Sequence, residues 1–156
     1  MINIHTGDST KIRGLEAPFW TRFHNLSSYT TTMHVIDEGI DTGDIIKQIS
    51  SPFEDFSTTI YPVQIAQQIS DMIVSHIKQY CLGDKSNIKY TKNDIKTTTY
   101  HTLPNNQDIK TMKEKGVNFI DTKVLKTHLL NQYTNQKLAL RQYEELKCNL
   151  KICLNT

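Results

Sequence analysis

The glycines of this chain are concentrated near its start: four of the six lie within the first 43 residues, at Gly7, Gly14, Gly39 and Gly43. Glycine permits backbone conformations that other residues avoid, so tight turns are expected there. Strand-like runs lie at 2–4, 32–36 and 45–49, and the segment 37–44, rich in glycine and aspartate, joins the last two. A further β-prone run covers 97–100. The first third of the chain is therefore predicted to consist of short strands joined by structured loops.

Helical patterns follow later in the sequence. Apolar residues recur at three- and four-residue steps over 62–80, which predicts an amphipathic helix. A second helix is expected to begin after an Asn105 cap, with Asp108 in the capping-box position, and to end at Lys115. A third helix is predicted over 122–151.

Composition and charge narrow the class of protein. With 156 residues the chain suits one domain, and 37% hydrophobic with 22% charged residues is typical of a folded soluble protein. The 18 basic residues nearly balance the 16 acidic ones, so the chain lacks the strong positive electrostatic field that non-specific nucleic-acid binding requires. No apolar run approaches the roughly 18 residues needed to cross a bilayer, and the first residues do not resemble a secretory leader. These features favour a cytoplasmic protein that binds neither nucleic acid nor membrane.

Asn3 and His5 are the residues that suggest chemistry. In a strand, residues i and i+2 project from the same side, so these two side chains should lie together. An amide N–H can stabilise a developing oxyanion, and an imidazole can move protons near neutral pH. Asp41, in the loop 37–44, can orient that imidazole or relay a proton. These residue types suit acyl transfer, although an Asn-x-His pair alone more often decorates the surface of a strand.

Four segments extend this pattern in a definite order. They are Asn-Ile-His-Thr-Gly at 3–7, Lys-Ile-Arg-Gly at 11–14, Thr-Thr-Met-His at 31–34 and Glu-Gly-Ile-Asp-Thr-Gly-Asp-Ile-Ile at 38–46. In order and separation they resemble the motifs of the folate-dependent formyltransferases, and the resemblance is specific over residues 1–50. It implies an α/β fold and a formyl group donated by the cofactor 10-formyltetrahydrofolate.

The resemblance also implies roles for the matched positions. Asn3 would polarise the formyl carbonyl and hold the oxyanion, and His5 would stabilise that charge and assist proton movement. Asp41 would be the partner of His5 and the proton relay. Gly39, Ile40 and Asp41 would form the cofactor-binding loop.

His34 matches a histidine that the family places on a strand near the pocket. Two interpretations are open: a member of the site, or a structural residue with satisfied hydrogen bonds. At 8–10 this chain has Asp-Ser-Thr where the family has Leu-Leu-Pro. A turn at the mouth of the expected pocket is therefore polar here instead of apolar.

The expected fold class is α/β: a truncated doubly wound, formyltransferase-like sheet with a helical C-terminal extension. Residues 1–100 are expected to form the C-terminal portion of the catalytic domain, and residues 101–156 the extension. The resemblance implies a further N-terminal half that carries most of the folate-binding wall, so the chain is interpreted as a fragment of the domain. Without the neighbouring strands, Ile36, Ile45 and Trp20 should be partly exposed.

The expected function is formyl transfer to a small-molecule amine, an amino sugar nucleotide being more natural than a transfer RNA. A deformylase, which would pass the formyl group to water with the same three residues, is one alternative. An inactive fragment or a helix-mediated interaction module is another. The C-terminal helix has a coiled-coil-like spacing with interruptions, and it is expected to lie on its own domain or on a loosely packed extension, with a homodimer formed through it as the alternative. No metal site is expected, because Asp37 and Asp41 lack the remaining ligands of a calcium loop and the histidines lack zinc-binding spacing.

Overall fold

The computed structural model describes residues 1–53, 66–82, 85–117, 126–127 and 130. Contacts divide the chain into two compact units, Met1–Ile120 and Asp121–Thr156. The first unit therefore includes residues 101–117, which were expected in the C-terminal extension. Apart from the helical residues 126–127 and 130, the helix predicted over 122–151 lies outside the described residues, and so does the dimer contact considered as an alternative.

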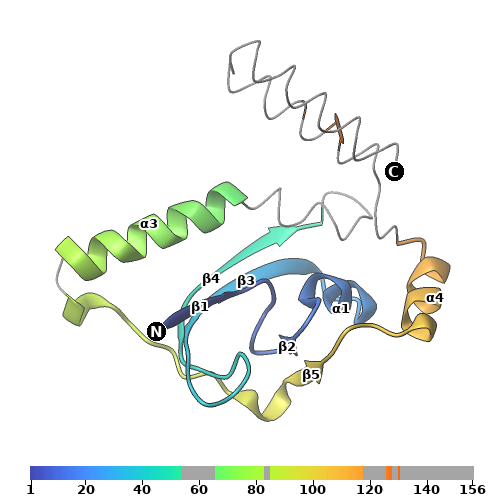
Figure 1. Cartoon of the computed structure of the whole chain (residues 1–156), viewed down its shortest axis with the longest axis horizontal. Coiled ribbons are helices and arrows are strands. Elements are labelled where there is room, and N and C mark those ends of the chain that lie inside the picture. Colours follow the sequence, from blue (N-terminus) through green and yellow to red (C-terminus); the bar gives the residue numbers. More distant parts are fainter. Residues whose placement is uncertain (54–65, 83–84, 118–125, 128–129, 131–156) are drawn as a thin grey trace. The chain divides into compact units, whose positions relative to one another are not determined.

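The main sheet has three strands, β1 (Ile2–His5), β3 (Ser28–Val35) and β4 (Ile45–Pro52) (Figure 1). They pair in the order β1-β3-β4, and both pairs are antiparallel. The three strands predicted from the sequence are confirmed. β3 begins earlier than its apolar pattern indicates, because its first half is Ser-Tyr-Thr-Thr, and these threonines are buried. β-branched threonine suits a strand even where its polarity hides the pattern.

A second sheet pairs β2 (Ile12–Gly14) with β5 (Thr99–His101) in parallel. Gly14 has a φ of 95°, and a Cβ there would clash with the carbonyl oxygen of His101, so the close approach of the two strands requires glycine. The expected α/β class is confirmed. Within the described residues, however, one antiparallel triplet and one parallel pair do not make up the expected doubly wound sheet.

The main hydrophobic core joins β2 to two helices, α1 (Ala17–Phe23) and α4 (Asn106–Glu114). Its buried members are Ile12, Ala17, Phe19, Trp20, Met112 and Val117. Sequence periodicity does not reveal α1, because a helix of seven residues completes too few turns to show a repeat. The core thus depends on contacts between residues that are far apart in the chain.

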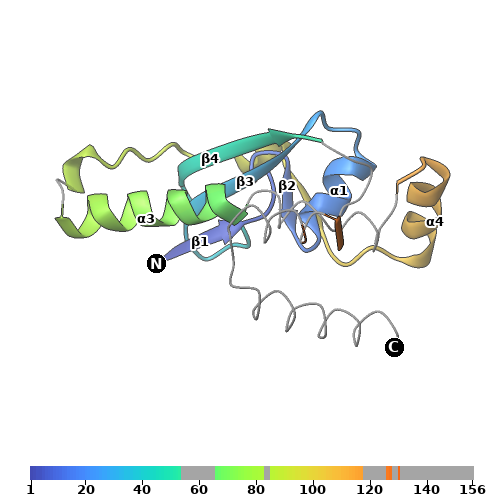
Figure 2. The same cartoon turned by 90° about the horizontal axis from the view of Figure 1, so that it is seen from above.

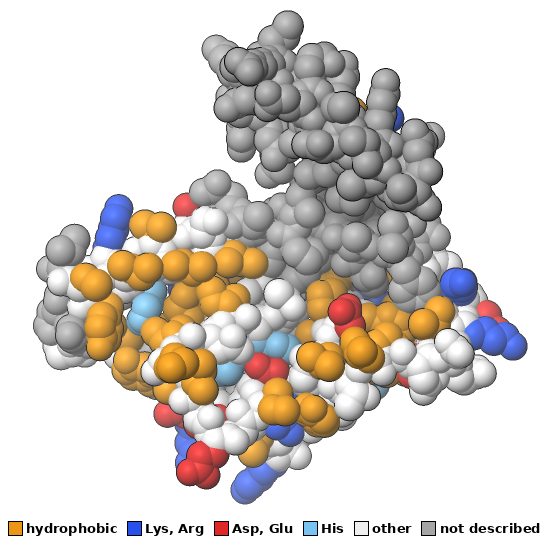
Figure 3. Space-filling view, in the orientation of Figure 1, with side chains coloured by type: hydrophobic (Ala, Val, Ile, Leu, Met, Phe, Trp, Pro, Cys, Tyr) orange, Lys and Arg blue, Asp and Glu red, His pale blue; other side chains and the backbone are white. Residues whose placement is uncertain are grey.

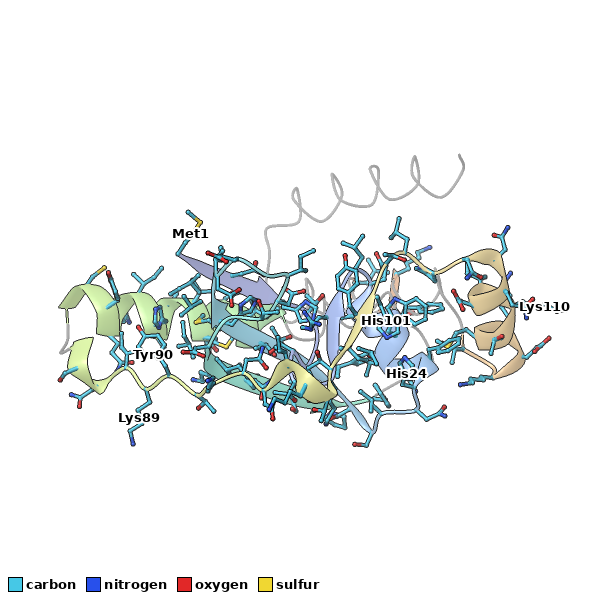
Figure 4. All side chains as sticks on the ribbon, turned by 90° about the horizontal axis from the view of Figure 1, so that it is seen from below. Met1, His24, Lys89, Tyr90, His101 and Lys110 are labelled. Carbon is cyan, nitrogen blue, oxygen red and sulfur yellow. The ribbon has the colours of Figure 1, made fainter. Side chains whose placement is uncertain are left out.

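Trp20 is buried, contrary to the expectation that it would be partly exposed. Only 7% of its surface is exposed, its ring stacks on His101 at 4.1 Å, and its Nε1 donates to the carbonyl oxygen of Thr102 at 3.0 Å. Nε2 of His101 lies in turn 3.1 Å from Nε2 of His24 (Figure 4). The segment around β5 therefore covers the indole ring.

Ile45 is also buried, at 7% exposure, and that expectation was wrong too. Its backbone pairs with Thr91, with N···O distances of 2.7 and 2.8 Å, so the chain after α3 covers this end of β4. Ile36, at 44% exposure, is partly exposed as expected. Two short 3₁₀ helices, η1 (Lys85–Asn87) and η2 (Ile95–Thr97), shape the covering segment.

The beginning and end of α4 confirm the predicted helix. Asn105 Oδ1 accepts hydrogen bonds from the N–H groups of Gln107 and Asp108 at 2.7 and 3.0 Å. Asp108 Oδ2 accepts from the N–H of Asn105 at 2.9 Å, which completes the capping box. Lys115 closes the helix.

α3 (Ala66–Leu82) lies along the main sheet (Figure 2). Its Ile69 packs against Tyr29 of β3. α3 confirms the helix predicted over 62–80, of which residues 62–65 lie outside the described part. A cavity of about 220 Å³ lies between α3 and strands β3 and β4, and the buried Nε2 of His76, in its lining, has no hydrogen-bond partner. Hydrophobic side chains gather over this helix (Figure 3), where the exposed residues are Ile73, Val74, Ile77 and Tyr80.

Candidate functional site

The pairing of β1 with β3 places Asn3 directly opposite His34. Opposed residues of an antiparallel pair have neighbouring side chains on the same face of the sheet. Between β3 and β4 the register shifts at Met33 and His34, so that His34 pairs with Ile45. Such a bulge re-aims the side chain beside it. The sheet thus brings Asn3 Nδ2 to 3.2 Å from His34 Nε2.

Asp41 approaches these residues from the loop between β3 and β4. Its φ of 54° lies in the left-handed region, which aspartate tolerates better than most residues. The loop is closed internally, because the carboxylate of Asp37 accepts from the N–H of Gly39 at 3.2 Å and from the hydroxyl of Thr42 at 2.6 Å. Gly43 lets the loop lie against the end of β3, where a Cβ would clash with a backbone carbonyl.

Each carboxylate oxygen of Asp41, which is 8% exposed, has two polar neighbours. Oδ1 lies 3.3 Å from Asn3 Nδ2 and 3.4 Å from His34 Nε2. Oδ2 lies 3.3 Å from His5 Nδ1 and accepts from the N–H of Gly14 at 2.9 Å. The structure therefore brings together Asn3, His5 and Asp41, and His34 belongs to the same group. These four residues are called the Asp41 cluster below.

In both His5 and His34, the ring nitrogen that does not face Asp41 lies beside a backbone carbonyl oxygen. His5 Nε2 lies 2.9 Å from the oxygen of Ile12, and His34 Nδ1 lies 2.8 Å from the oxygen of Val35. A carbonyl only accepts, so both of these nitrogens carry a hydrogen, and the nitrogen that faces the carboxylate is the one that titrates. The His5 ring also packs so closely on Gly7 that a Cβ there would clash with it. Neither nitrogen of His5 is open to a ligand in this arrangement.

Burial and charge act differently on the ionisable members of the Asp41 cluster. Burial lowers the pKa of His5, and the nearby carboxylate opposes this only in part. The hydrogen bond to Asp41 raises the pKa of His34 despite desolvation. Burial alone would raise the pKa of Asp41, but hydrogen bonds from His34 and the Gly14 N–H, together with the charge of His5, lower it. These directions favour an ionised Asp41 with its neighbouring proton on His34 rather than on His5.

Asn93 supports the Asp41 cluster from a distant part of the chain. Its side chain is 6% exposed, and its Nδ2 donates to the backbone carbonyl of Asp41 at 3.1 Å and to the hydroxyl of Ser9 at 3.3 Å. Its Oδ1 is buried without a hydrogen-bond partner. Asn93 thereby ties the Asp41 loop to the turn at 8–10. No sequence pattern marks it, because it stands in a polar segment without periodicity.

Gly39 and Ile40, expected in the cofactor-binding loop, are exposed and come directly before Asp41. The N–H of Gly39 is held by the carboxylate of Asp37, and the carbonyl of Ile40 accepts from Arg13 Nη1 at 3.2 Å. The Ile40 residue is 54% exposed. In this loop, an exposed apolar side chain therefore directly precedes a buried carboxylate in the sequence.

Metal and membrane features are absent from the part of the chain that the structure describes. In it, no group of three or more His, Cys, Asp or Glu side chains is arranged to hold a metal ion. No helix there combines the length and the apolar character needed to span a membrane.

No protein-family model and no curated protein matches the chain, but solved structures do. WlaRD, described as a sugar 3N-formyltransferase in the presence of dTDP and 5-N-formyl-THF, is 23% identical over 65% of this chain and 36% of its own, with a TM-score of 0.56. The N-formyltransferase from Helicobacter canadensis, in complex with folinic acid and dTDP-3-aminofucose, is 21% identical over 69% and 38%, with a TM-score of 0.58. PseJ from Anoxybacillus kamchatkensis, a formyltransferase in complex with UDP-4,6-dideoxy-4-formamido-L-AltNAc and tetrahydrofolate, is 27% identical over 65% and 52%, with a TM-score of 0.55.

The chain has a formyltransferase-like fold over about 65% of its length. It spans between 36% and 52% of the length of these three proteins, so the similarity covers only part of each of them. The resemblance inferred from the motifs of residues 1–50 is thereby confirmed at the level of the fold.

Proposed function

We propose that the Asp41 cluster is the catalytic centre of a formyltransferase that moves a formyl group from 10-formyltetrahydrofolate to an amine, with an amino sugar nucleotide as the acceptor. The observation that carries this proposal is the buried Asp41 carboxylate, which lies 3.3 Å from Asn3 Nδ2 and 3.3 Å from His5 Nδ1. The descriptions of the similar solved structures, which name folate compounds and nucleotide sugars, support the choice of donor and acceptor. In this proposal the described sheet is the C-terminal portion of a doubly wound domain.

The residues present fit a folate donor. Ile40 is 54% exposed and offers an apolar surface to a flat ring, while Asn3, which is only partly buried, offers an amide to a carbonyl group. Gly39, Ile40 and Asp41 are the proposed contacts. Bound there, 10-formyltetrahydrofolate would supply the activated formyl group.

Asn3 is proposed to stabilise the negative charge that develops on the formyl oxygen. Its amide nitrogen must face Asp41, because a carboxylate cannot donate to the amide oxygen. One N–H therefore holds the side chain in place, and the other is the group that can reach a ligand. A fixed donor of this kind lowers the barrier because it need not reorganise during the reaction.

Asp41 and His5 are proposed to handle the proton that the attacking amine loses. His5 is buried and its pKa is lowered, so it is neutral at pH 7 and able to take up a proton at Nδ1. The resulting imidazolium has a partner for each N–H, Ile12 at Nε2 and Asp41 at Nδ1. The carboxylate is thus placed to accept the proton and pass it to the ring, and the same pair would return a proton to the departing folate nitrogen as its bond to the formyl carbon breaks.

The test is an assay of the chain with 10-formyltetrahydrofolate and a panel of dTDP- and UDP-linked amino sugars, scored by N-formyl product and by formate. Replacing Asn3 by Ala should lower kcat about 10²- to 10³-fold with little change in KM, because the lost interaction is strongest in the transition state. Asp41→Asn and His5→Ala should also lower kcat, by about 10²- to 10⁴-fold. Cys81→Ala, at an exposed thiol on α3, is the matched control and should keep kcat within about twofold.

The alternatives give different results in the same assay. Formate without N-formyl product would identify a deformylase. A folded chain that binds folinic acid in calorimetry but gives neither product would contradict the proposal. A folded chain that does not bind folinic acid would favour the fragment or interaction-module alternative, to which the exposed apolar residues of α3 also point.

A further inference from the structure

Three polar atoms of the Asp41 cluster form a nearly equilateral triangle. Asn3 Nδ2 lies 3.2 Å from His34 Nε2 and 3.3 Å from Asp41 Oδ1, and those two atoms lie 3.4 Å from each other. The amide nitrogen brings two hydrogens, the ionised carboxylate none, and the imidazole nitrogen either one or none. The hydrogen on His34 therefore determines which of the three pairs can bond.

The tautomer of His34 is fixed by its own strand. Nδ1 lies 2.8 Å from the carbonyl oxygen of Val35, so Nδ1 carries a hydrogen whether the ring is neutral or charged. In the neutral ring, Nε2 has a lone pair and accepts from the amide of Asn3. In the charged ring, Nε2 donates to Asp41 Oδ1, and the bond from Asn3 is lost because two N–H groups would face each other.

We propose that His34 is a positioning residue whose Nε2 proton releases the second N–H of Asn3, while the first N–H stays bonded to Asp41. This inference rests on the proposed function, in which an N–H of Asn3 stabilises the formyl oxygen. The neutral ring occupies that N–H within the protein, and the charged ring frees it for a ligand. Asn3 is only partly buried and can present the freed N–H to an incoming carbonyl.

The titratable groups around His34 favour its charged ring, which is the state that releases the N–H of Asn3 and is called the releasing state below. Asp41 acts on the ring through its hydrogen bond, and Asp37 acts through its charge from the same loop. Across the shared carboxylate, the charge of His34 in turn lowers the pKa of His5. Because the two carboxylates prevail and raise the pKa of His34, the releasing state persists to a higher pH than in a free histidine and is lost as the pH rises through the raised pKa.

The experiment is a pH titration of the ¹⁵N-labelled full chain by NMR, without folate or amine. It follows the ring nitrogens of His34 and the side-chain NH₂ of Asn3, which the spectrum of Asn3→Ala assigns. One of the two Asn3 N–H protons should move upfield, the direction of a weakened hydrogen bond, as His34 becomes protonated. Its midpoint should coincide with that of His34 Nε2.

Two variants separate this effect from a structural one. His34→Gln keeps hydrogen-bonding groups and cannot titrate, and His34→Phe keeps a ring without nitrogen. In both, the Asn3 titration should disappear, and the Gln variant serves if the Phe variant does not fold. His24→Gln, which removes an exposed histidine outside the Asp41 cluster, should leave the Asn3 titration unchanged.

The inference is overturned if the Asn3 resonances stay constant while His34 titrates, or if they keep their midpoint in His34→Gln. The titration needs no turnover, so a chain that fails to transfer formyl groups would count against the proposed function and not against this coupling. Where turnover is present, the fall of kcat on the alkaline side should be lost in His34→Gln.

Discussion

The side-chain nitrogen of Asn93 lies 3.1 Å from the backbone carbonyl oxygen of Asp41, across 52 residues of sequence. The same nitrogen donates to the hydroxyl of Ser9 at 3.3 Å. One buried amide therefore sets the position of the loop that carries the central carboxylate, although it touches none of the four side chains of the Asp41 cluster by a hydrogen bond.

Replacing Asn93 by Ala should destabilise the protein by about 1–3 kcal/mol, because two buried groups lose their donor. Urea unfolding at pH 7 measures this change. Lys92→Ala, at the exposed neighbouring position, is the control and should stay within about 0.5 kcal/mol of the wild type. Equal stability of Asn93→Ala and the wild type would contradict the structural role of the amide.

Asp41→Asn should destabilise the protein at pH 7 and remove part of its acid sensitivity. Asparagine tolerates the left-handed backbone at this position, so the variant changes charge with little added strain. The pKa of Asp41 is lowered by folding, so its contribution is present above its ordinary value of 3.8 and lost as the pH falls through the folded value. The difference in unfolding free energy between variant and wild type should therefore shrink from pH 7 to pH 3. A constant difference would show that folding leaves the pKa of Asp41 unchanged.

His34 should make the protein lose stability on the alkaline side. Its pKa is raised by folding, so the folded state binds the proton more tightly; this contribution is complete below about pH 6.5 and lost as the pH rises through the folded value. Unfolding free energies of the wild type should fall over that interval, and those of His34→Gln should fall less. Parallel curves for the two proteins would contradict the raised pKa.

Asn105→Ala should destabilise the protein by about 1 kcal/mol, through loss of the capping bonds of α4. The effect should extend to the whole first unit, because α4 supplies Met112, which is fully buried in the main core. Thermal unfolding measures the change. Gln107→Ala, exposed in the same turn, should shift the midpoint much less.

Gly14 and Gly116 form a matched pair for testing the β2–β5 contact. Both have positive φ, 95° and 76°, but a Cβ at Gly14 meets the backbone of His101, whereas a Cβ at Gly116 has no atom within 4 Å. Gly116→Ala should therefore cost about 1–2 kcal/mol from backbone strain alone. Gly14→Ala should cost clearly more in the same urea experiment, and equal costs would show that the two strands can separate freely.

Local sequence signals were enough to predict several parts of this structure. The capping box of α4 involves residues three apart, and the shared side of Asn3 and His5 follows from strand parity within one run. The placement of Asp41 beside them came from the ordered motifs, which no local rule supplies. The sequence does not decide whether His34 belongs to the site, because its position beside Asn3 follows from the register of β1 with β3.

Other parts depend on contacts that no local pattern encodes. β2 has three residues and exists as a strand because Ile12 pairs with Thr99, far along the chain. The burial of Trp20 and Ile45 was missed for the same reason, since the covering segment after α3 is polar and irregular. The supporting role of Asn93 lies in that segment too.

β1 is an edge strand within the described residues, bonded to β3 alone, and it carries both Asn3 and His5. Short edge strands belong to the parts of a protein that open by local fluctuation, at a smaller free energy than global unfolding. Detachment of β1 would dismantle the Asp41 cluster while α1, α4 and their shared core stayed folded. The Asp41 cluster is therefore a less stable cooperative unit than the fold around it, and heat or denaturant should break up the cluster before helical structure is lost.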